Sequence, residues 1–457
     1  MTTLPELTTA YAGGARVADV IAEIRAAVDP TDPVWISTVS EAALAERARS
    51  LDAAAPEERA RRPLFGVPFA VKDNIDVAGL PTTAGCPAFA FVPGRSATAV
   101  QRLEDAGAVL VGKTNLDQFA TGLVGTRSPY GIPTNPFGAA YIPGGSSSGS
   151  AVAVARGLVT FALGTDTAGS GRVPAAFTAT VGIKPTHGLI STAGVLPACR
   201  SLDCVSIFAR SVADARAVFE VAAGPDVHDA FSRRAPDRQL PPPPTFRFAV
   251  PLPEQQEFFG DVQARRTFET ALERLASIGG YPVSVDLTPC FAAAELLYNG
   301  PFVAERTAAV GDFIDANPDA VLEVTRSIIA SGRRYSAVDA FRAQYRIQEL
   351  RAAVQAIFSD ITLLAVPSTP TIYTRADIAA EPYACNARLG MYTNFVNLLD
   401  LCAIAIPSGW YDTGLPIGVT LIGPAFSDAA LGHVATRFLN EDWCVHREGS
   451  LHDERFA

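Results

Sequence analysis

The sequence predicts an α/β protein in which a large mixed, mainly parallel β-sheet carries helices on both faces. Of the 457 residues, 48% are hydrophobic, which is enough to fill a substantial buried sheet. Apolar runs of strand length alternate with helical patterns past residue 220, and this alternation is typical of a sheet covered by helices. Two clusters of Gly and Ser, at residues 144–150 and 164–174, supply small residues where backbone amides can approach a ligand.

The N-terminal elements follow from the spacing of apolar residues. Helical spacing covers residues 15–28, 41–53 and 98–106, and strand patterns cover residues 35–39, 64–71 and 108–111. The strand that starts at residue 64 runs directly into Lys72, Asp73 and Asn74. Because ligand sites of open α/β sheets form at the carboxyl ends of strands, we expect Lys72 to reach such a site.

The first Gly and Ser cluster predicts a loop that leads into a helix. Residues 145–149 also fit G-x-S-x-G, the nucleophile elbow of α/β hydrolases, with Ser147 as the nucleophile. We reject the elbow because it needs a strand directly upstream, whereas residues 137–143 are interrupted by Gly and Pro. Residues 151–156 are rich in Ala and Val and predict a helix, whose N-terminus offers free N–H groups.

The second Gly and Ser cluster follows a short apolar strand at residues 160–163. The small residues at 165–170 are suited to form a nest of backbone amides around an oxyanion. Ser170 is therefore the candidate nucleophile, and Ser146 from the first cluster is the candidate hydroxyl beside it.

The C-terminal half begins after a proline-rich spacer at residues 234–244, which is too short to separate mobile domains. Strand patterns cover residues 246–250, 282–285, 361–367, 402–406 and 417–422, and helical patterns cover residues 258–278, 291–313, 320–330, 337–358 and 428–439. The helices between about 258 and 358 break the α/β alternation, and such an insertion commonly lines a substrate pocket. We expect one domain over residues 1–457 that contains this helical insertion.

Composition excludes several classes of function. The net charge is −10 with only 37 Lys and Arg, which argues against a nucleic-acid or membrane-binding surface. The seven cysteines are scattered without a C-x-x-C pair, which indicates reduced thiols and no metal site. The first residues lack a signal-peptide pattern, and no apolar run reaches 18 residues, so we expect a soluble cytoplasmic protein.

Residues 107–114, ending in Gly112-Lys113-Thr114, satisfy the Walker A pattern of nucleotide-binding loops. The four residues between the two glycines are Ala-Val-Leu-Val, which predict a strand rather than a glycine-rich phosphate loop. We therefore interpret the match as chance.

A serine nucleophile needs a base, and the candidates are few. Of the five histidines only His187 is placed to approach the sheet, and we favour a structural role for it. Lys72, Lys113 and Lys184 all lie near the glycine-rich strand ends. Lowering a lysine pKa from about 10.4 to about 7 costs on the order of 4–5 kcal/mol, which burial beside hydroxyls can supply. Lys72 has the most apolar approach, but on this reasoning alone a structural role for it stays open.

Taken together, these segments resemble the amidase-signature family of Ser–Ser–Lys hydrolases. The matching motifs are Ala70-Val71-Lys72-Asp73-Asn74, Gly112-Lys113-Thr114-Asn115, Gly144-Gly145-Ser146-Ser147-Ser148-Gly149, Gly164-Thr165-Asp166-Thr167-Ala168-Gly169-Ser170, Lys184-Pro185-Thr186-His187-Gly188 and Gly414-Leu415-Pro416-Ile417-Gly418. The resemblance implies that Ser170 attacks the carbonyl, that Ser146 on a cis peptide relays the proton and that Lys72 is the base. It also implies an oxyanion hole made by the amides of Thr167, Ala168, Gly169 and Ser170.

Some motifs of this chain differ from the usual pattern of the family and match one of its subgroups. The family usually has Gly-Gly-Ser-Ile-Arg at the nucleophile, whereas this chain has Ala168-Gly169-Ser170-Gly171-Arg172. That segment, together with residues 298–306 and 389–401, is similar to allophanate hydrolases. The resemblance implies that Tyr298 and Arg306 bind the substrate, and their spacing of about two turns puts both on one face of a helix. Without the resemblance, we would favour a core tyrosine and a surface arginine.

The resemblance implies an amide hydrolase that converts allophanate to ammonia and N-carboxycarbamate without a metal or organic cofactor. It further implies a homodimer, and it leaves open whether a urea carboxylase-type pathway partner makes the substrate. Full-length allophanate hydrolases often carry an additional C-terminal domain, which we expect this chain to lack. The alternatives are an amidase for other small acyl amides, a binding protein that has kept only the fold, or an amidotransferase A-type subunit.

Overall fold

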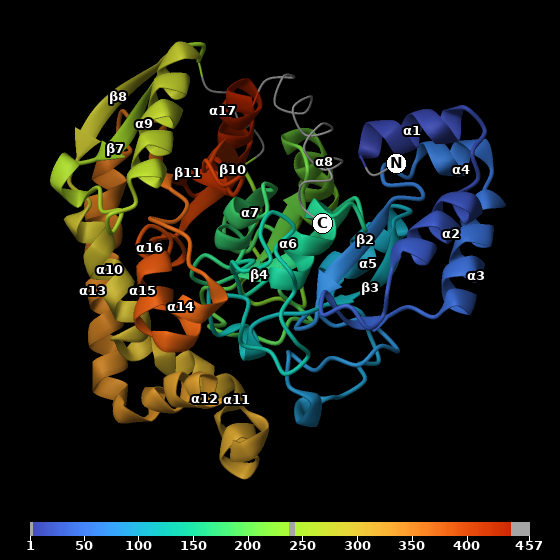
Figure 1. Ribbon diagram of the computed structural model, residues 1–457, viewed down its shortest axis with the longest axis horizontal. Helices are drawn as coiled ribbons and strands as arrows, with labels where there is room; N and C mark the ends of the chain where they lie inside the picture. Colours follow the sequence, from blue (N-terminus) through green and yellow to red (C-terminus); the bar gives the residue numbers. More distant parts are fainter. Residues whose placement is uncertain (1–2, 237–242, 440–457) are drawn as a thin grey trace.

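The computed structural model describes residues 3–236 and 243–439. Within this part of the chain, one sheet of 11 strands crosses the molecule in the order β1-β3-β2-β4-β6-β5-β10-β11-β9-β7-β8 (Figure 1). The strands are β1 (Trp35–Thr38), β2 (Pro68–Lys72), β3 (Val109–Thr114), β4 (Phe161–Asp166), β5 (Val181–Lys184), β6 (Cys204–Ala209), β7 (Phe246–Pro251), β8 (Gly280–Val285), β9 (Leu363–Pro367), β10 (Leu401–Trp410) and β11 (Pro416–Pro424). Part of the predicted spacer, Cys444, His446 and His452 lie outside the described residues.

The expected mixed sheet is confirmed, but the expectation that it is mainly parallel is wrong. Of the ten neighbouring strand pairs in the described residues, four are parallel and six are antiparallel. One reason is that only residues 411–415 join β10 to β11, and so short a link requires an antiparallel pair. The sequence pattern also gave no separate signal for β5 and β6, which both run antiparallel to their neighbours.

Helices cover both faces of the sheet, as expected. They are α1 (Leu4–Ala12), α2 (Val17–Ala27), α3 (Glu41–Asp52), α4 (Pro56–Ala60), α5 (Thr98–Asp105), α6 (Ser148–Ala155), α7 (Val173–Phe177), α8 (Val212–Ala222), α9 (Val262–Ser277), α10 (Thr288–Tyr298), α11 (Ala304–Ala316), α12 (Glu323–Ala330), α13 (Ala337–Ile357), α14 (Arg375–Ala380), α15 (Ala384–Leu389), α16 (Phe395–Leu398) and α17 (Asp428–Leu439). One core cluster joins the sheet to α5, α8, α9 and α17, and another joins the opposite face to α6 and α7.

The two central strands β2 and β4 are held side by side by aromatic packing. They pair in parallel, with Phe69 opposite Phe161, and the two rings stack at 5.2 Å. Both side chains are fully buried, and burying a phenylalanine side chain contributes roughly 1.5–3 kcal/mol. Because side chains alternate along a strand, Ala70 and Lys72 share the face that α6 covers, opposite Phe69.

The helix predicted over residues 291–313 is interrupted. The structure ends α10 at Tyr298 and begins α11 at Ala304, with a 3-10 turn at Pro301–Val303 between them. Proline lacks the N–H that would continue the helix, and it disfavours helical geometry at the residue before it. The argument that put Tyr298 and Arg306 on one helix face is therefore wrong, because they lie on two helices.

The helices α10 to α13 form the lower left of the molecule, beside α14, α15 and α16 (Figure 1). Apolar side chains of α10, α13 and α16 share one core cluster, which includes Leu297, Ile347 and Phe395. The helical insertion is thus present between α9 and β9, although β8 lies within it. The treatment of residues 1–457 as one domain stays a prediction.

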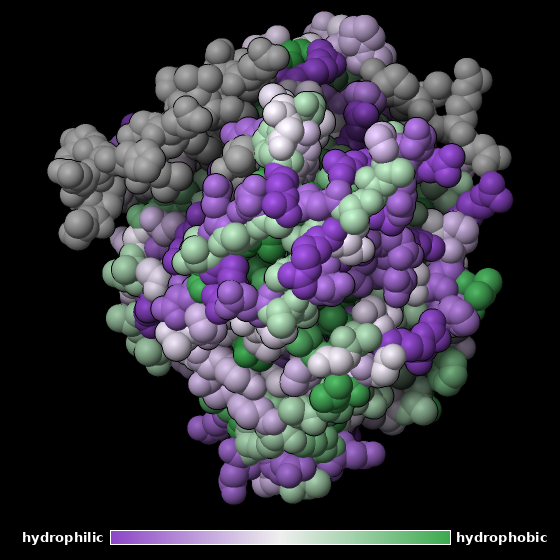
Figure 2. All heavy atoms as spheres, turned by 90° about the vertical axis from the view of Figure 1, so that its right-hand side faces the viewer, coloured by the Kyte–Doolittle hydropathy of each residue, from purple (hydrophilic) through white to green (hydrophobic). Residues whose placement is uncertain are grey.

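The face of the molecule at the right of Figure 1 is mostly hydrophilic, with apolar side chains scattered among charged ones (Figure 2). Such scattered exposure is ordinary for a protein surface. Among the described residues, no helix is both long enough and apolar enough to cross a membrane.

Candidate active site

Three polar side chains that are far apart in the sequence meet at the carboxyl end of the central strands. Lys72 ends β2, Ser146 precedes α6 and Ser170 follows β4. The Lys72 Nζ atom lies 2.7 Å from Ser146 Oγ, which lies 2.9 Å from Ser170 Oγ. Lys72 and Ser146 are fully buried and Ser170 is 4% exposed. The three side chains therefore form a continuous line of hydrogen bonds that ends at the hydroxyl nearest the surface.

The peptide bond between Gly145 and Ser146 is cis, as the resemblance implied. Only glycine fits at position 145, because an added Cβ atom would lie 2.0 Å from Asp117 Oδ2 and 2.5 Å from the Gly125 nitrogen. The backbone N–H of Asp117 donates to the Ser146 carbonyl at 3.0 Å. The loop that carries Ser146 is thus clamped against Asp117.

A second hydroxyl fixes the lysine. Lys72 Nζ donates to Thr165 Oγ1 at 2.8 Å, and the same oxygen accepts a hydrogen bond from the amide of Asn74 at 3.3 Å. A neutral amine has two N–H groups and one lone pair. In the structure Lys72 Nζ also donates to Ser146 Oγ. When the amine is neutral, the contact with Thr165 needs only one N–H, so the lone pair can instead accept the proton of Ser146.

Burial lowers the pKa of Lys72 into the range that suits a base. Burial lowers its pKa from 10.5 to about 7, against the opposing effect of the nearby carboxylates of Asp117, Asp203 and Asp166. The positive charge of Arg306 adds to the lowering. A base whose pKa lies near the working pH is present in its neutral form and still binds a proton well.

The loop after β4 is held by a buried ion pair. Arg172 donates to both carboxylate oxygens of Asp166 at 2.9 Å, and both side chains are fully buried. The Asp166 carboxylate also accepts the backbone N–H of Gly169 at 3.0 Å and of Gly171 at 2.9 Å. These bonds fix the backbone on both sides of Ser170.

One amide of the predicted oxyanion hole has another hydrogen-bond partner in the structure. The Gly169 amide already donates to Asp166, so it is not free to bind an oxyanion. Within residues 3–236 and 243–439, the amides of Thr167, Ala168 and Ser170 have no such partner. The oxyanion hole stays a prediction, and of its four amides those of Thr167, Ala168 and Ser170 are the ones without another partner in the described part of the chain.

Two buried carboxylates near the site were missed by the sequence analysis. Asp117 accepts the N–H groups of Val124, Gly125 and Arg127, which shapes the loop facing Gly145. Asp203 accepts a hydrogen bond from the hydroxyl of Thr167 at 2.5 Å. Neither carboxylate lies in a Gly and Ser cluster, so residue spacing alone gave no signal for them.

The other predicted pair, Tyr298 and Arg306, meets although the two residues lie on separate helices. Arg306 Nη2 donates to Tyr298 Oη at 3.2 Å. Arg306 Nη1 donates to the Thr121 hydroxyl at 2.9 Å, and the side chain is 2% exposed. Arg306 is therefore not the surface arginine of the simpler interpretation. Its Nε atom is buried and has no hydrogen-bond partner among the described residues.

A pocket of about 560 Å³ opens beside this pair. Its lining includes Tyr298, Arg127, Gly390 and Asn394. The segment that holds Gly390 and Asn394 also packs on the loop of Ser170, since the carbonyl of Thr393 accepts a hydrogen bond from Arg172 at 3.1 Å. The pocket thus borders Tyr298 and the segment that packs on the loop of Ser170, although Lys72, Ser146, Ser170 and Arg306 are not among its lining residues.

The other candidate bases from the sequence make contacts that stabilise the fold. Lys113 pairs with Asp73 at 3.0 Å within the buried strand β3, so the Walker-like segment is a strand and not a phosphate loop. Lys184 donates to the carbonyl of Leu401 at 2.7 Å. Burial lowers the pKa of His187 to about 4, and its ring packs against Phe231. These residues support the fold rather than the site around Ser170.

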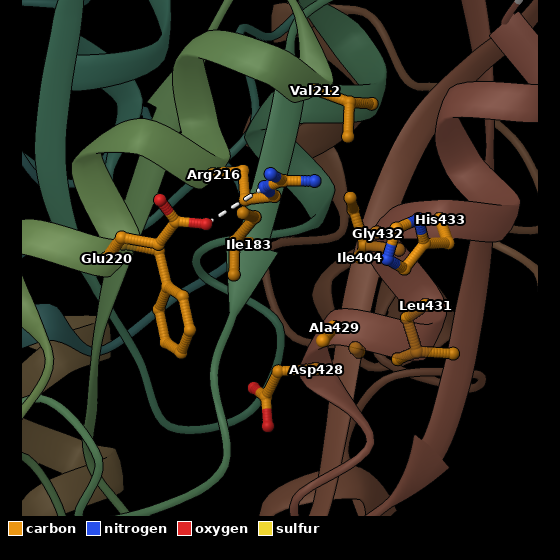
Figure 3. Close-up of a pocket in the computed structure, with 12 residues that line it drawn as sticks. Ile183, Val212, Arg216, Glu220, Ile404, Asp428, Ala429, Leu431, Gly432 and His433 are labelled. Carbon is orange, nitrogen blue, oxygen red and sulfur yellow. Dashed lines mark hydrogen bonds and ion pairs between the residues drawn. The ribbon is translucent and has the colours of Figure 1, made fainter. Parts of the chain in front are cut away.

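A separate pocket of about 290 Å³ lies between α8 and α17 (Figure 3). Apolar side chains such as Val212 and Leu431 line it, together with His433 and the ion pair of Arg216 and Glu220. None of the site residues predicted from the sequence is among its lining residues. This pocket is therefore separate from the Lys72, Ser146 and Ser170 cluster.

The described cysteines are all free and buried, which agrees with the expected reduced core thiols. Within the described ranges, no group of three or more His, Cys, Asp or Glu side chains is arranged to hold a metal ion.

Comparison with known proteins identifies the family to which the chain is similar. The model of the family described as Amidase matches residues 19–431. A urea amidolyase of Lachancea kluyveri is 48% identical over 412 residues, which is 90% of this chain but 22% of that protein. The solved structure of the allophanate hydrolase of Kluyveromyces lactis is 43% identical, with a TM-score of 0.91, and the match covers 96% of this chain and 72% of that one.

A more distant relative is matched over nearly its whole length. The glutamyl-tRNA(Gln) amidotransferase A-type subunit of Acidobacterium capsulatum is 34% identical over 468 residues, which is 94% of this chain and 97% of that protein. This chain thus spans about a fifth of the urea amidolyase and nearly all of the amidotransferase relative. The family match and the shared fold lead to one conclusion: the chain belongs to the amidase family.

Proposed function

We propose that this protein is an amide hydrolase that cleaves allophanate, with Ser170 as nucleophile, Ser146 as proton relay and Lys72 as base. The observation that carries the proposal is the unbroken line of contacts from Lys72 Nζ through Ser146 Oγ to Ser170 Oγ, at 2.7 and 2.9 Å. Hydroxyls in line with a neutral amine can pass a proton without any group moving far.

In the first step, Ser170 Oγ forms a bond to the terminal carbonyl carbon of the substrate. The proton of Ser170 passes to Ser146, and the proton of Ser146 passes to Lys72. The carbonyl oxygen becomes an oxyanion, which the free amides of Thr167, Ala168 and Ser170 are arranged to stabilise. Removing one such donor from an oxyanion hole typically costs on the order of 100-fold in kcat.

In the second step, the carbon–nitrogen bond breaks and the leaving group takes the relayed proton to depart as ammonia. The acyl group stays on Ser170 as an ester. Water then attacks this ester, with Lys72 accepting the water proton through Ser146. Ser170 regains its proton, and the product is N-carboxycarbamate.

The polar groups at the substrate end of the site are suited to bind a small anion. Arg306 carries a buried positive charge with one unpartnered N–H group, and Tyr298 brings a hydroxyl against it. A buried guanidinium strongly favours a carboxylate partner, because each bond to a charged group is stronger than a neutral one. We therefore propose that Arg306 and Tyr298 recognise the carboxylate of allophanate.

The comparisons support this substrate over the alternatives. The urea amidolyase and allophanate hydrolase relatives reach 48% and 43% identity, whereas the amidotransferase relative reaches 34%. An amidase for other small amides, or an A-type subunit of an amidotransferase, remains the second candidate because the amidotransferase relative is matched over nearly its whole length.

The test is ammonia release by the purified protein from allophanate, compared with malonamate, biuret and simple acyl amides. We expect allophanate to give the highest kcat/KM, and the Ser170→Ala variant to lose turnover with an unchanged melting temperature. Highest activity on glutamine or on simple amides would favour the second candidate, and full activity of Ser170→Ala would reject the proposed nucleophile.

We further propose that the protein acts in the cytoplasm as a homodimer and receives its substrate from a urea carboxylase. The buried free cysteines support a reducing compartment. Allophanate is a carboxylated urea, so a biotin-type carboxylation of urea is the reaction class that supplies it. Light scattering of the purified protein tests the dimer, since a monomer mass at micromolar concentration would reject it.

A further inference from the structure

The segment Gly390–Asn394 lines the pocket beside the proposed site, and no role has been assigned to it so far. Asn394 lies in the pocket wall together with Tyr298, Gly390 and Met391. Its side chain folds back on Gly390, where an added Cβ atom would lie 2.5 Å from Asn394 Nδ2 and 2.6 Å from Oδ1. The absence of a side chain at Gly390 therefore leaves the space that the Asn394 amide occupies.

The side-chain carbonyl oxygen of Asn394 lacks a hydrogen-bond donor. Asn394 Oδ1 is buried and has no hydrogen-bond donor among the described residues. A buried acceptor without a donor costs about 1–3 kcal/mol, so native proteins usually satisfy such groups. By contrast, Asn386 in the same pocket wall uses its Oδ1 to accept the Leu123 N–H at 2.8 Å. Asn394 thus presents an acceptor that the described part of the protein leaves free.

The position of Asn394 indicates which group donates a hydrogen bond to its side-chain carbonyl oxygen. On one side the pocket reaches Tyr298, which bonds to Arg306 at 3.2 Å. On the other side Thr393, the residue before Asn394, packs on the loop of Ser170, because a Cβ added to Gly169 would lie 2.5 Å from Thr393 Oγ1. A substrate with its carboxylate at Arg306 and its amide carbonyl at Ser170 would have its bridging atom between these two residues, and Asn394 borders that region through its neighbours Thr393 and Tyr298.

We propose that Asn394 is a specificity-determining residue whose side-chain carbonyl accepts a hydrogen bond from the bridging N–H of a ureido substrate. This inference rests on the proposed function, since it needs a substrate with an N–H between the carboxylate and the reacting carbonyl. Allophanate has that N–H, and malonamate has a CH₂ group in the same place. Malonamate leaves Asn394 Oδ1 unsatisfied, so the site discriminates against it. A site that bonds a substrate N–H generally rejects the analogue that lacks it.

The test compares kcat/KM for allophanate and for malonamate in matched variants of the full chain. Asn394→Leu keeps the side-chain size and removes the acceptor. We expect it to lower kcat/KM for allophanate at least tenfold and to change the value for malonamate less than twofold. The selectivity ratio therefore falls at least fivefold.

A second variant and a control variant are included, so that the test does not depend on the Asn394→Leu substitution alone. Gly390→Ala introduces a Cβ where the Asn394 amide lies and has an ordinary backbone angle of φ −81°, so it should lower the same ratio by displacing that amide. Asn299→Leu makes the same chemical change in the same pocket wall, where the side chain is exposed and bonds Glu295. We expect Asn299→Leu to leave the ratio unchanged.

The outcomes separate this inference from the proposed function. A wild-type protein that hydrolyses simple amides but not allophanate overturns the proposed substrate and the inference with it. A wild type active on allophanate, with an Asn394→Leu variant that loses both substrates equally or neither, overturns the inference alone. A lower melting temperature with an unchanged ratio also counts against it, because it indicates a purely structural role.

Discussion

The hydroxyl of Thr167 donates a hydrogen bond of 2.5 Å to the buried carboxylate of Asp203. This contact ties the first amide of the proposed oxyanion hole to a charge that sequence motifs did not reveal. The same carboxylate accepts the backbone N–H groups of Ala198 and Cys199, at 2.8 and 3.2 Å. Burial raises the pKa of Asp203 to about 6, so near neutral pH it carries its charge close to Lys72.

The first prediction concerns Asp203 as a positioning residue. The negative charge of Asp203 raises the pKa of Lys72. The Asp203→Asn variant keeps the shape but loses that charge, so the pKa of Lys72 falls below about 7. Because the base must be neutral, the acidic limb of the kcat/KM profile should move to lower pH. The measurement is the pH dependence of kcat/KM, and a limb that stays in place or moves upward would contradict the prediction.

The second prediction concerns the cost of keeping Lys72 neutral. Its pKa is about 7 in the folded protein and 10.5 as the reference value. The unfolded chain therefore binds more protons between these two values, and the stability cost is complete below pH 7 and disappears as the pH rises toward 10.5. That cost is on the order of 4 kcal/mol. We expect Lys72→Met to be inactive and more stable than the wild type at pH 7.

The measurement for Lys72→Met is the free energy of unfolding at pH 7 and at pH 10. The gain in stability over the wild type should shrink at the higher pH, because pH 10 is close to the reference pKa of 10.5 and most of the cost of losing the proton on folding has then disappeared. A gain that is equal at both pH values would show that packing, and not charge, accounts for it.

The third prediction concerns the close approach at Gly145. A methyl group there would meet Asp117 Oδ2 at 2.0 Å and the Gly125 nitrogen at 2.5 Å. Since the latter is a backbone atom, the loop of Ser146 must move. We expect Gly145→Ala to lower kcat at least 100-fold and to destabilise the fold by about 1–3 kcal/mol. Gly94→Ala is the control, because no heavy atom lies within 4 Å of its added Cβ. Equal melting temperatures and activities of the two variants would contradict this prediction.

The sequence predicted most of the helices and strands but not the direction of the strands. Continuous apolar runs locate β2 and β4, yet only pairing contacts determine that β6 runs antiparallel to β4. Likewise, the Gly and Ser clusters pointed to Ser146 and Ser170, because small residues mark close backbone approach. The partners Asp117 and Asp203 were missed because they act through backbone N–H groups and a hydroxyl, which leave no spacing pattern. The helical spacing of apolar residues continues across Pro301, so the spacing alone did not predict the break between α10 and α11.

The last prediction concerns Arg306, whose charge acts on Lys72 in the opposite direction to Asp203. The Arg306 guanidinium lowers the pKa of Lys72, so Arg306→Met should raise that pKa and move the acidic limb of kcat/KM to higher pH. The same change removes the proposed partner of the substrate carboxylate, and KM for allophanate should rise at least tenfold. KM for a neutral amide of similar size should change much less, because it has no carboxylate to lose. Opposite movement of the limb in Arg306→Met and Asp203→Asn is therefore the expected result if Lys72 titrates, since both charges act on that one amine. If the two variants moved the limb in the same direction, the titrating base would have to be another residue.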